Sequence, residues 1–511
     1  MTRVAVATSS ELAADAATEI IEAGGNAVDA ALAASLLTMN TEPGVCSLAG
    51  GALITVWPAN DAPISFDGYV TVPGLDGGAQ PVASESVTMA YGGGVTTTIG
   101  AGSVAVPGSP MAVEAARQRF GKLSLPQLLA PSIRAAREGF PLPSACHHYL
   151  GYSAKPVFGR DATTYQALHP DGESLLQAGD LLRLPGLDDT LQCLADNGIE
   201  SLYGGELGDV IVEHLQSTGS RLSRKDLTAY SVDVRTSHVV DLVDWRIAVN
   251  PPPSIGGSML AAILQGIEQG QTLLTMLRKS LQHRRGNLDF ATDLTAATQR
   301  LLNVAAVEAN RLGQHISAAT VHTSAVDSDG LACAITASSG YGSGEVPPGT
   351  GLWLNNCLGE LELNRRGLEA GPPGARLPSN MSPVAARNAQ QVLAIGSPGA
   401  DRITSALAQT LQRFLIDGES LHSAVEAPRV HVEAALESLA TGYYPETLYC
   451  EPNARLGAHD IDSVQQFEHQ SMFFGGVGAA LLDNATSGPA LSAAADSRRN
   501  GGTTIRRSTV R

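Results

Sequence analysis

The sequence predicts a protein of mixed α and β structure with a deep core. Residues 10–38 are rich in apolar and small side chains and are interrupted at Gly24-Gly25, which predicts two consecutive helices. Residues 321–335 hold two stretches that suit β-strands, and the turn signal at 327–330 joins them into a hairpin. Hydrophobic residues make up 43% of the 511-residue chain, whereas aromatic residues make up only 5%. Because glycine and alanine are abundant, we expect close, backbone-rich packing.

Charge and composition exclude several classes of partner. The formal net charge of −17 disfavours nucleic acid and anionic membranes. The chain has no apolar run of 18 residues, and its first apolar stretch is too short for a signal peptide. We therefore expect a cytoplasmic protein. The six cysteines form no CxxC pair and no metal-ligand spacing, which favours reduced thiols, four of them buried.

The first half of the chain alternates turns, strands and helices. Residues 48–57 read as a glycine turn into a buried strand, and residues 64–68 end the next strand. Helices are expected up to Arg119 and over 124–138. The layout of a dinucleotide site, a strand followed by GxGxxG and a helix, is missing. We expect no cofactor.

The middle of the chain is expected to be mainly helical from 155 to 250. Adjacent histidines do not share a helix face, and His147-His148 has no carboxylate cluster nearby in sequence, so we expect no metal there. Residues 270–290, which include Arg284-Arg285, are expected to form an exposed helix and loop. In the last third, residues 431–439 are expected to be a strand, and the tail 503–511 is expected to be disordered.

Motifs along most of the chain resemble the γ-glutamyltransferase (γ-glutamyltranspeptidase) family. The match runs from about residue 5 to residue 502. It rests on segments such as Glu22–Ala31, Arg134–Phe140, Leu222–Tyr230, Thr320–Asp327, Gly351–Asn356, Ala394–Arg402 and Ala493–Gly501. The resemblance implies an α+β fold, the four-layer αββα sandwich of N-terminal-nucleophile hydrolases.

The resemblance also implies self-cleavage of the Ala319–Thr320 bond. Residues 1–319 and 320–511 would then be two fragments of one interleaved domain, a heterodimer that could pair further into a dimer of heterodimers. A threonine hydroxyl is a poor nucleophile and needs a nearby base. Cleavage supplies one, because it exposes an α-amine whose unperturbed pKa is about 7.7–8.0. We therefore expect the uncleaved precursor to be inactive.

The reaction groups of the family carry over to this sequence. Thr320 matches the nucleophile, and Ser338 matches a second hydroxyl residue that contacts it. Gly399 and Ala400 match a glycine pair whose backbone N–H groups form the oxyanion hole, and each such donor is worth about 10²–10³ in rate.

The groups that recognise a glutamyl substrate carry over badly. Asp67 stands where the family has an arginine that binds the α-carboxylate of the substrate. A carboxylate at this position would repel the substrate carboxylate, unless Asp67 turns away or binds a cationic group. Glu360 stands within the place of an Asp pair, Cys357 replaces a glutamine beside Asn356, and a serine pair becomes Ser379-Asn380. The expected substrate-binding residues are Asp67, Asn356, Glu360, Ser379 and Asn380.

These matches predict an autoprocessed threonine amidohydrolase or acyltransferase that acts on a small amide or γ-glutamyl-like substrate. One alternative is a specialised-metabolite enzyme of the same family, in an antibiotic pathway, that cleaves a carbon–carbon bond. An alternative of another class is an uncleaved pseudoenzyme or binding protein. The hydroxyls of Thr320 and Ser338 and the turn at 399–400 speak against the latter.

Overall fold

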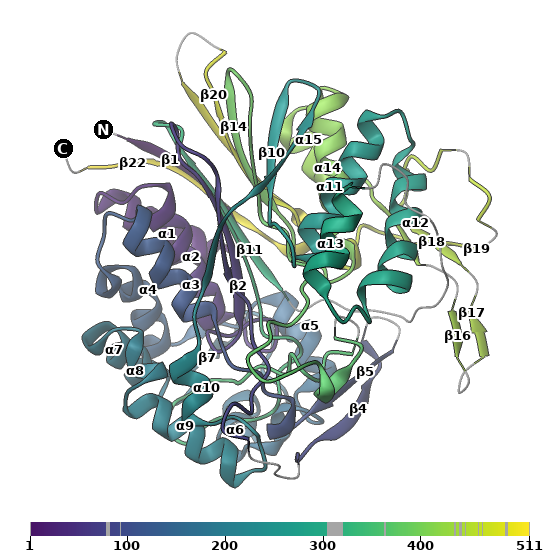
Figure 1. The fold of residues 1–511 in the computed structure, drawn as a ribbon. Helices are drawn as coiled ribbons and strands as arrows, with labels where there is room; N and C mark the ends of the chain where they lie inside the picture. Colours follow the sequence, from purple (N-terminus) through teal and green to yellow (C-terminus); the bar gives the residue numbers. More distant parts are fainter. Residues whose placement is uncertain are drawn as a thin grey trace.

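Two antiparallel β-sheets lie face to face, and helices cover the outer face of each, so the molecule has the four layers expected (Figure 1). The computed structural model describes residues 2–77, 82–91, 94–303, 320–361, 364–433, 436–438, 442–444, 446–457, 459–461, 463–485 and 489–509. Within these ranges, no helix is both long and apolar enough to cross a membrane.

The first sheet has seven strands in the order β22-β1-β11-β12-β2-β3-β8. Its central hairpin is the one that the turn at 327–330 predicts. The strands are β1 (Arg3–Thr8), β2 (Gly51–Trp57), β3 (Ile64–Gly68), β8 (Asp233–Thr236), β11 (Val321–Asp327), β12 (Ala332–Ser338) and β22 (Gly502–Arg507).

The second sheet has six strands in the order β21-β20-β14-β13-β10-β9. Its strands are β9 (His238–Leu242), β10 (Trp245–Val249), β13 (Val384–Arg387), β14 (Gln391–Gly396), β20 (Gly478–Asp483) and β21 (Ala490–Ala495). Small side chains fill the space between the sheets, mostly alanines with Trp57 as the one large ring. The sequence therefore predicted this close packing correctly.

The first two helices on the first sheet begin at side-chain caps. Asn26 and Asp29 form a capping box at the start of α2, and Ser10 accepts a hydrogen bond from the backbone N–H of Ala13 at the start of α1. The helices of this layer include α1 (Glu11–Glu22), α2 (Ala27–Thr41), α3 (Ser109–Phe120) and α4 (Leu125–Glu138). Those beside the second sheet include α11 (Ile255–Glu268), α12 (Leu273–His283), α13 (Leu294–Asn303), α14 (Arg402–Leu411) and α15 (Leu421–Glu426).

Shorter elements flank this frame. They include β4 (Glu85–Met89), β5 (Val95–Ile99), β6 (Phe140–Pro141), β7 (Leu181–Leu182), α5 (Ser144–Ser153), α6 (Ala162–Leu168), α7 (Leu187–Asn197), α8 (Glu200–Tyr203), α9 (Glu206–Ser217), α10 (Arg224–Ala229), η4 (Arg284–Leu288), η6 (Gln412–Ile416), β15 (Val430–Glu433), β18 (Thr447–Cys450), β19 (Ser463–Gln466), η7 (Met472–Phe474) and η8 (Ser497–Arg499).

Two expectations about surface segments are wrong. Residues 502–507 are not a disordered tail, because they form β22 and pair with β1 from Arg3↔Arg507 to Thr8↔Gly502, next to the N-terminus (Figure 1). The segment 270–290 is not simply exposed, because Arg284 and Arg285 at its end are buried. Both errors come from long-range contacts that local composition does not encode. The segment 155–250 contains the helices expected, but it also contributes β7 to β10.

Candidate active site

Thr320 lies at the end of the first sheet, directly before β11, and is buried. Val321 pairs with Ala337 on β12, so Ser338, the next residue, lies opposite Thr320. The hydroxyl of Ser338 accepts a hydrogen bond from the backbone N–H of Gly340 at 3.2 Å. The structure therefore brings the two predicted hydroxyl residues to adjacent strand ends. Ala319, the other side of the expected cleavage bond, lies outside the described residues.

His322 lies two residues along β11 and is held as a neutral ring. Burial lowers the pKa of His322 to about 3. Its ring nitrogens bond to the hydroxyls of Thr336 at 2.9 Å and Ser324 at 2.7 Å. Both nitrogens are thus engaged within the space between the sheets, which is a structural role.

The turn after β14 lies against this same sheet end. A Cβ on Gly396 would come within 2.2 Å of the His322 ring, so the end of β14 packs directly on β11. Gly399 and Ala400 follow with φ of 135° and 47°, in the left-handed region. An alanine in that region costs about 1–2 kcal/mol, and such strain is concentrated at functional sites. This local geometry suits a backbone that presents N–H groups.

A residue that the sequence analysis gave no role connects this turn to Thr320. Arg499 donates from Nη1 to the carbonyl oxygen of Thr320 at 3.4 Å and is 8% exposed. Its side chain packs against Gly476, and Gly475 lies beside Gly399. Only its place in the C-terminal motif 493–501 marked this arginine, because the contact joins residues far apart in the sequence.

Asn356 and Glu360 converge next to Ser338. The side-chain oxygen of Asn356 accepts from the backbone N–H of Tyr341 at 2.7 Å, and its nitrogen donates to Thr97 at 2.9 Å. A Cβ on Gly340 would meet both the Asn356 amide and the Glu360 carboxyl group. The two predicted substrate-binding residues therefore lie beside the strand end that carries Ser338.

Ser379 and Asn380 lie beside the turn at 399–400. The Asn380 side chain donates to the carboxylate of Asp401, which directly follows Ala400. Ser379 accepts from the backbone N–H of Met381 at 3.2 Å. The Asn380 side chain thus bonds to Asp401, the residue directly before α14.

Asp67 binds cationic groups of its own chain. Its carboxylate lies 2.7 Å from Nη2 of Arg235 and 3.6 Å from Nε of Arg376, and it also accepts from the backbone N–H of Tyr69 at 3.1 Å. The charge that replaces the family arginine is therefore compensated inside the protein.

Tyr69 is a second residue that the sequence analysis missed. It follows β3 and lies opposite Gly51 of β2. Gly51 in turn pairs with Ser338 of β12, which lies opposite Thr320. Burial raises the pKa of Tyr69, and the neighbouring Cys357 and Glu360 add to this effect. Its phenol therefore stays neutral within the predicted substrate-binding region.

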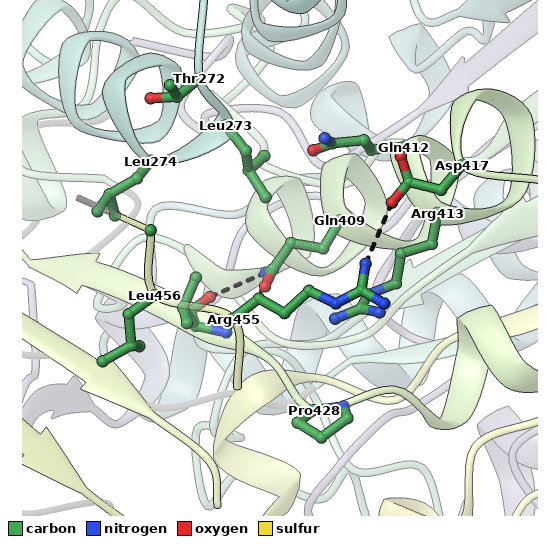
Figure 2. Close-up of a pocket in the computed structure, with 12 residues that line it drawn as sticks. Thr272, Leu273, Leu274, Gln409, Gln412, Arg413, Asp417, Pro428, Arg455 and Leu456 are labelled. Carbon is green, nitrogen blue, oxygen red and sulfur yellow. Dashed lines mark hydrogen bonds and ion pairs between the residues drawn. The ribbon is translucent and has the colours of Figure 1, made fainter. Parts of the chain in front are cut away.

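A surface cavity of about 210 Å³ lies elsewhere, between the start of α12, the end of α14 and β15 (Figure 2). Arg455 reaches across it to Asp417 at 3.4 Å, and Gln409 bonds to the backbone of Val430. Because it lies at the opposite end of α14 from Ala400, this cavity is separate from the turn at 399–400. In the part of the chain that the structure describes, no group of three or more His, Cys, Asp or Glu could hold a metal ion.

Comparison with known proteins assigns the family. The gamma-glutamyltranspeptidase family model matches residues 13–505. "Glutathione hydrolase 5 proenzyme" of Mus musculus is 28% identical over 98% of this chain and 92% of its own length. "Acylase ACY 1 proenzyme" of Pseudomonas sp. (strain V22) is also 28% identical, over 85% of this chain and 83% of its own length. The crystal structure of cephalosporin acylase from Bacillus halodurans superposes with a TM-score of 0.78 at 22% identity, covering 98% of this chain and 96% of that one, and supports the fold. The chain therefore belongs to the γ-glutamyltranspeptidase family of N-terminal-nucleophile hydrolases and transferases.

Proposed function

We propose that this protein is an autoprocessed amidohydrolase or acyltransferase with Thr320 as its nucleophile. The observation that carries the proposal is the position of Thr320 opposite Ser338 at one end of the first sheet, with the end of β14, just before Gly399-Ala400, packed on β11. The relatives named above are proenzymes, as a chain that must be cut before it acts would be.

The reaction follows from these groups. Cleavage before Thr320 leaves an α-amine that takes the proton of its own hydroxyl. The hydroxyl oxygen attacks the carbonyl carbon of the substrate amide, and the N–H groups of Gly399 and Ala400 hold the negative oxygen that develops. The amine product leaves with the proton. Water or an acceptor amine then attacks the ester on Thr320 and releases the acyl group.

The two fragments are proposed to stay together as a heterodimer. In the first sheet, β11 and β12 of the second fragment lie between β1 and β2 of the first, and β22 pairs with β1. Separation would break backbone hydrogen bonds along both sides of the hairpin. Cutting the chain therefore leaves the sheet intact.

The acyl group is proposed to differ from a simple γ-glutamyl group. Asp67 occupies the place of the family's carboxylate-binding arginine, and its carboxylate can only accept hydrogen bonds, so it cannot bind a substrate α-carboxylate. Its partners Arg235 and Arg376 are already engaged with it. A small amide held by Asn356, Glu360 and Ser379 fits this site better.

Self-cleavage is the first prediction to test. Purified protein should migrate as two bands on a denaturing gel, with Thr320 as the new N-terminus, because only that residue brings nucleophile and base together. Thr320→Ala should remain one chain, and Thr320→Ser should still be cut because it keeps the hydroxyl. Intact-mass data that show an active, unbroken 511-residue chain would contradict the proposal.

A further inference from the structure

Buried guanidinium groups gather at the start of α14, directly after the turn at 399–400. The cluster, here called the arginine cluster, contains the cations Arg284, Arg285, Arg365 and Arg402 and the carboxylates Asp289, Asp401 and Glu433. These side chains come from η4 and the residue after it, from the start of α14, from β15 and from the segment around residue 365.

Ion pairs organise part of the arginine cluster. Arg284 donates to both Asp401 and Asp289, the latter at 2.9 Å. Burial disfavours the charged form of Arg284, but these two carboxylates outweigh burial and raise its pKa. Arg365 reaches Asp289 at 2.7 Å, and its side chain is 16% exposed, so the cluster extends to solvent there.

Arg402 retains donors that protein groups do not use. It is 1% exposed and reaches Glu433 through Nη2 at 3.3 Å. Its Nε and Nη1 have no hydrogen-bond partner in the described structure, and the ring of Phe473 lies 4.1 Å from its guanidinium carbon. Leaving charged N–H groups dry and unpaired is costly, which favours an anion as their partner.

Arg285 adds positive charge to the same place. Burial lowers its pKa to about 10, and the neighbouring Arg365 and Arg284 lower it further, whereas Asp401 opposes them. The group remains charged at neutral pH. A carboxylate beside Arg402 would therefore also be attracted by the positive charge of Arg285.

We propose that the arginine cluster binds an anionic group of the substrate, a carboxylate, beside the oxyanion turn. This inference rests on the proposed function. The planar fork of a guanidinium matches a carboxylate in a bidentate manner, which makes Arg402 a specificity-determining residue. Carboxylate recognition is thereby moved from the strand position of Asp67 to the helix ends at 284–285 and 402.

Glutarate binding by the purified enzyme tests this site. Isothermal titration should show glutarate binding, whereas glutaramide, its neutral diamide, should bind at least tenfold more weakly. Arg402→Gln and Arg285→Gln should each weaken glutarate binding at least tenfold. The matched control is Arg278→Gln, which removes a half-exposed guanidinium of α12 paired with Glu446 outside the arginine cluster and should leave binding unchanged.

A kinetic split separates this role from general support of the fold. For an amide substrate with a carboxylate on its acyl chain, Arg402→Gln should raise KM at least tenfold, while the neutral carboxamide analogue should keep its KM. Arg402→Lys keeps the charge without the fork and provides a second variant if Arg402→Gln does not fold. Equal glutarate affinity in the parent and in the variants would overturn the proposal. The gel of the same preparations reports self-cleavage separately, so failure of the anion site and failure of the proposed function are distinguished.

Discussion

In the proposed mechanism the base for Thr320 is its own α-amine, and the buried imidazole of His322 does not take that role. His322 is two residues away, but burial lowers its pKa to about 3, so the ring is neutral at neutral pH. Hydroxyl groups bond to both of its ring nitrogens. The α-amine that cleavage releases would titrate near neutral pH. Arg499, bonded to the carbonyl of the same residue, fixes the main chain on which both groups sit.

Ser338 provides the next prediction at this scale. Its hydroxyl lies on the strand end opposite Thr320, where it can bond to the nucleophile. Ser338→Ala should slow self-cleavage or turnover by roughly tenfold, in line with the loss of one hydrogen bond of about 1 kcal/mol or more. Ser338→Thr keeps the hydroxyl and should be tolerated. Rates of processing and turnover that are equal for the parent and Ser338→Ala would remove Ser338 from the mechanism.

Asp67 gives a prediction about both specificity and stability. Asp67→Arg restores the family residue in sequence, but here it would place a third guanidinium against Arg235 and Arg376. We expect a loss of about 3 kcal/mol in the free energy of unfolding, because a buried pair is broken and like charges replace it. Urea unfolding should show a smaller loss for Asp67→Asn, which removes the charge without reversing it.

The same variant should not become a γ-glutamyl enzyme. We expect kcat/KM on a γ-glutamyl anilide well below ~10⁴ M⁻¹s⁻¹ for the parent, and no gain in Asp67→Arg. A parent enzyme that is efficient on this substrate would show that the ion pair at Asp67 lies outside the recognition of glutamate.

At the scale of elements, the sequence predicted correctly those helices and strands that depend on local propensity and turn residues. The hairpin β11–β12 follows from strand propensity on both sides of Asp327–Gly330, and α1 and α2 follow from the glycine break at 24–25. The wrong expectations for β22 and η4 arise because contacts with residues distant in the sequence determine these segments. Pairing of β22 with β1 joins the two ends of the chain, and no pattern within residues 503–511 signals it.

The site was predictable where motif positions could be matched and unpredictable where contacts join distant elements. Thr320 and Ser338 lie at adjacent strand ends, and the end of β14, which leads into the turn at 399–400, packs on β11. Tyr69 has no local signal, and only their places in the motifs 394–402 and 493–501 marked Arg402 and Arg499, because a buried arginine or tyrosine is recognised only once its neighbours are known. The arginine cluster in particular needs η4, β15 and α14 to be placed together.

At the scale of the whole molecule, the burial of ionisable groups couples folding to pH. Glu42 ends α2, is 5% exposed and accepts a hydrogen bond from the hydroxyl of Ser9. Burial raises its pKa to about 7, although the Ser9 hydrogen bond and Arg499 oppose the shift. The folded protein therefore holds a proton on Glu42 over a pH range in which the unfolded chain, with a pKa near 4.5, has lost it.

Stability should consequently fall as pH rises from about 4.5 to about 7, since the folded state binds more protons than the unfolded state in this window. The contribution of Glu42 could reach about 3 kcal/mol, at 1.36 kcal/mol for each pKa unit. Glu42→Gln stays neutral and can still accept from Ser9, so it should remove this part of the decline. Urea unfolding of Glu42→Gln and its parent at pH 5 and pH 7.5, both carrying Thr320→Ala so that one chain unfolds, measures the difference. Burial also raises the pKa of Asp327, to about 6. The stability that Asp327 contributes falls with pH equally in both proteins, so it cancels from the difference between them. Identical pH slopes would mean that Glu42 is already ionised in the folded protein, with Arg499 outweighing its burial.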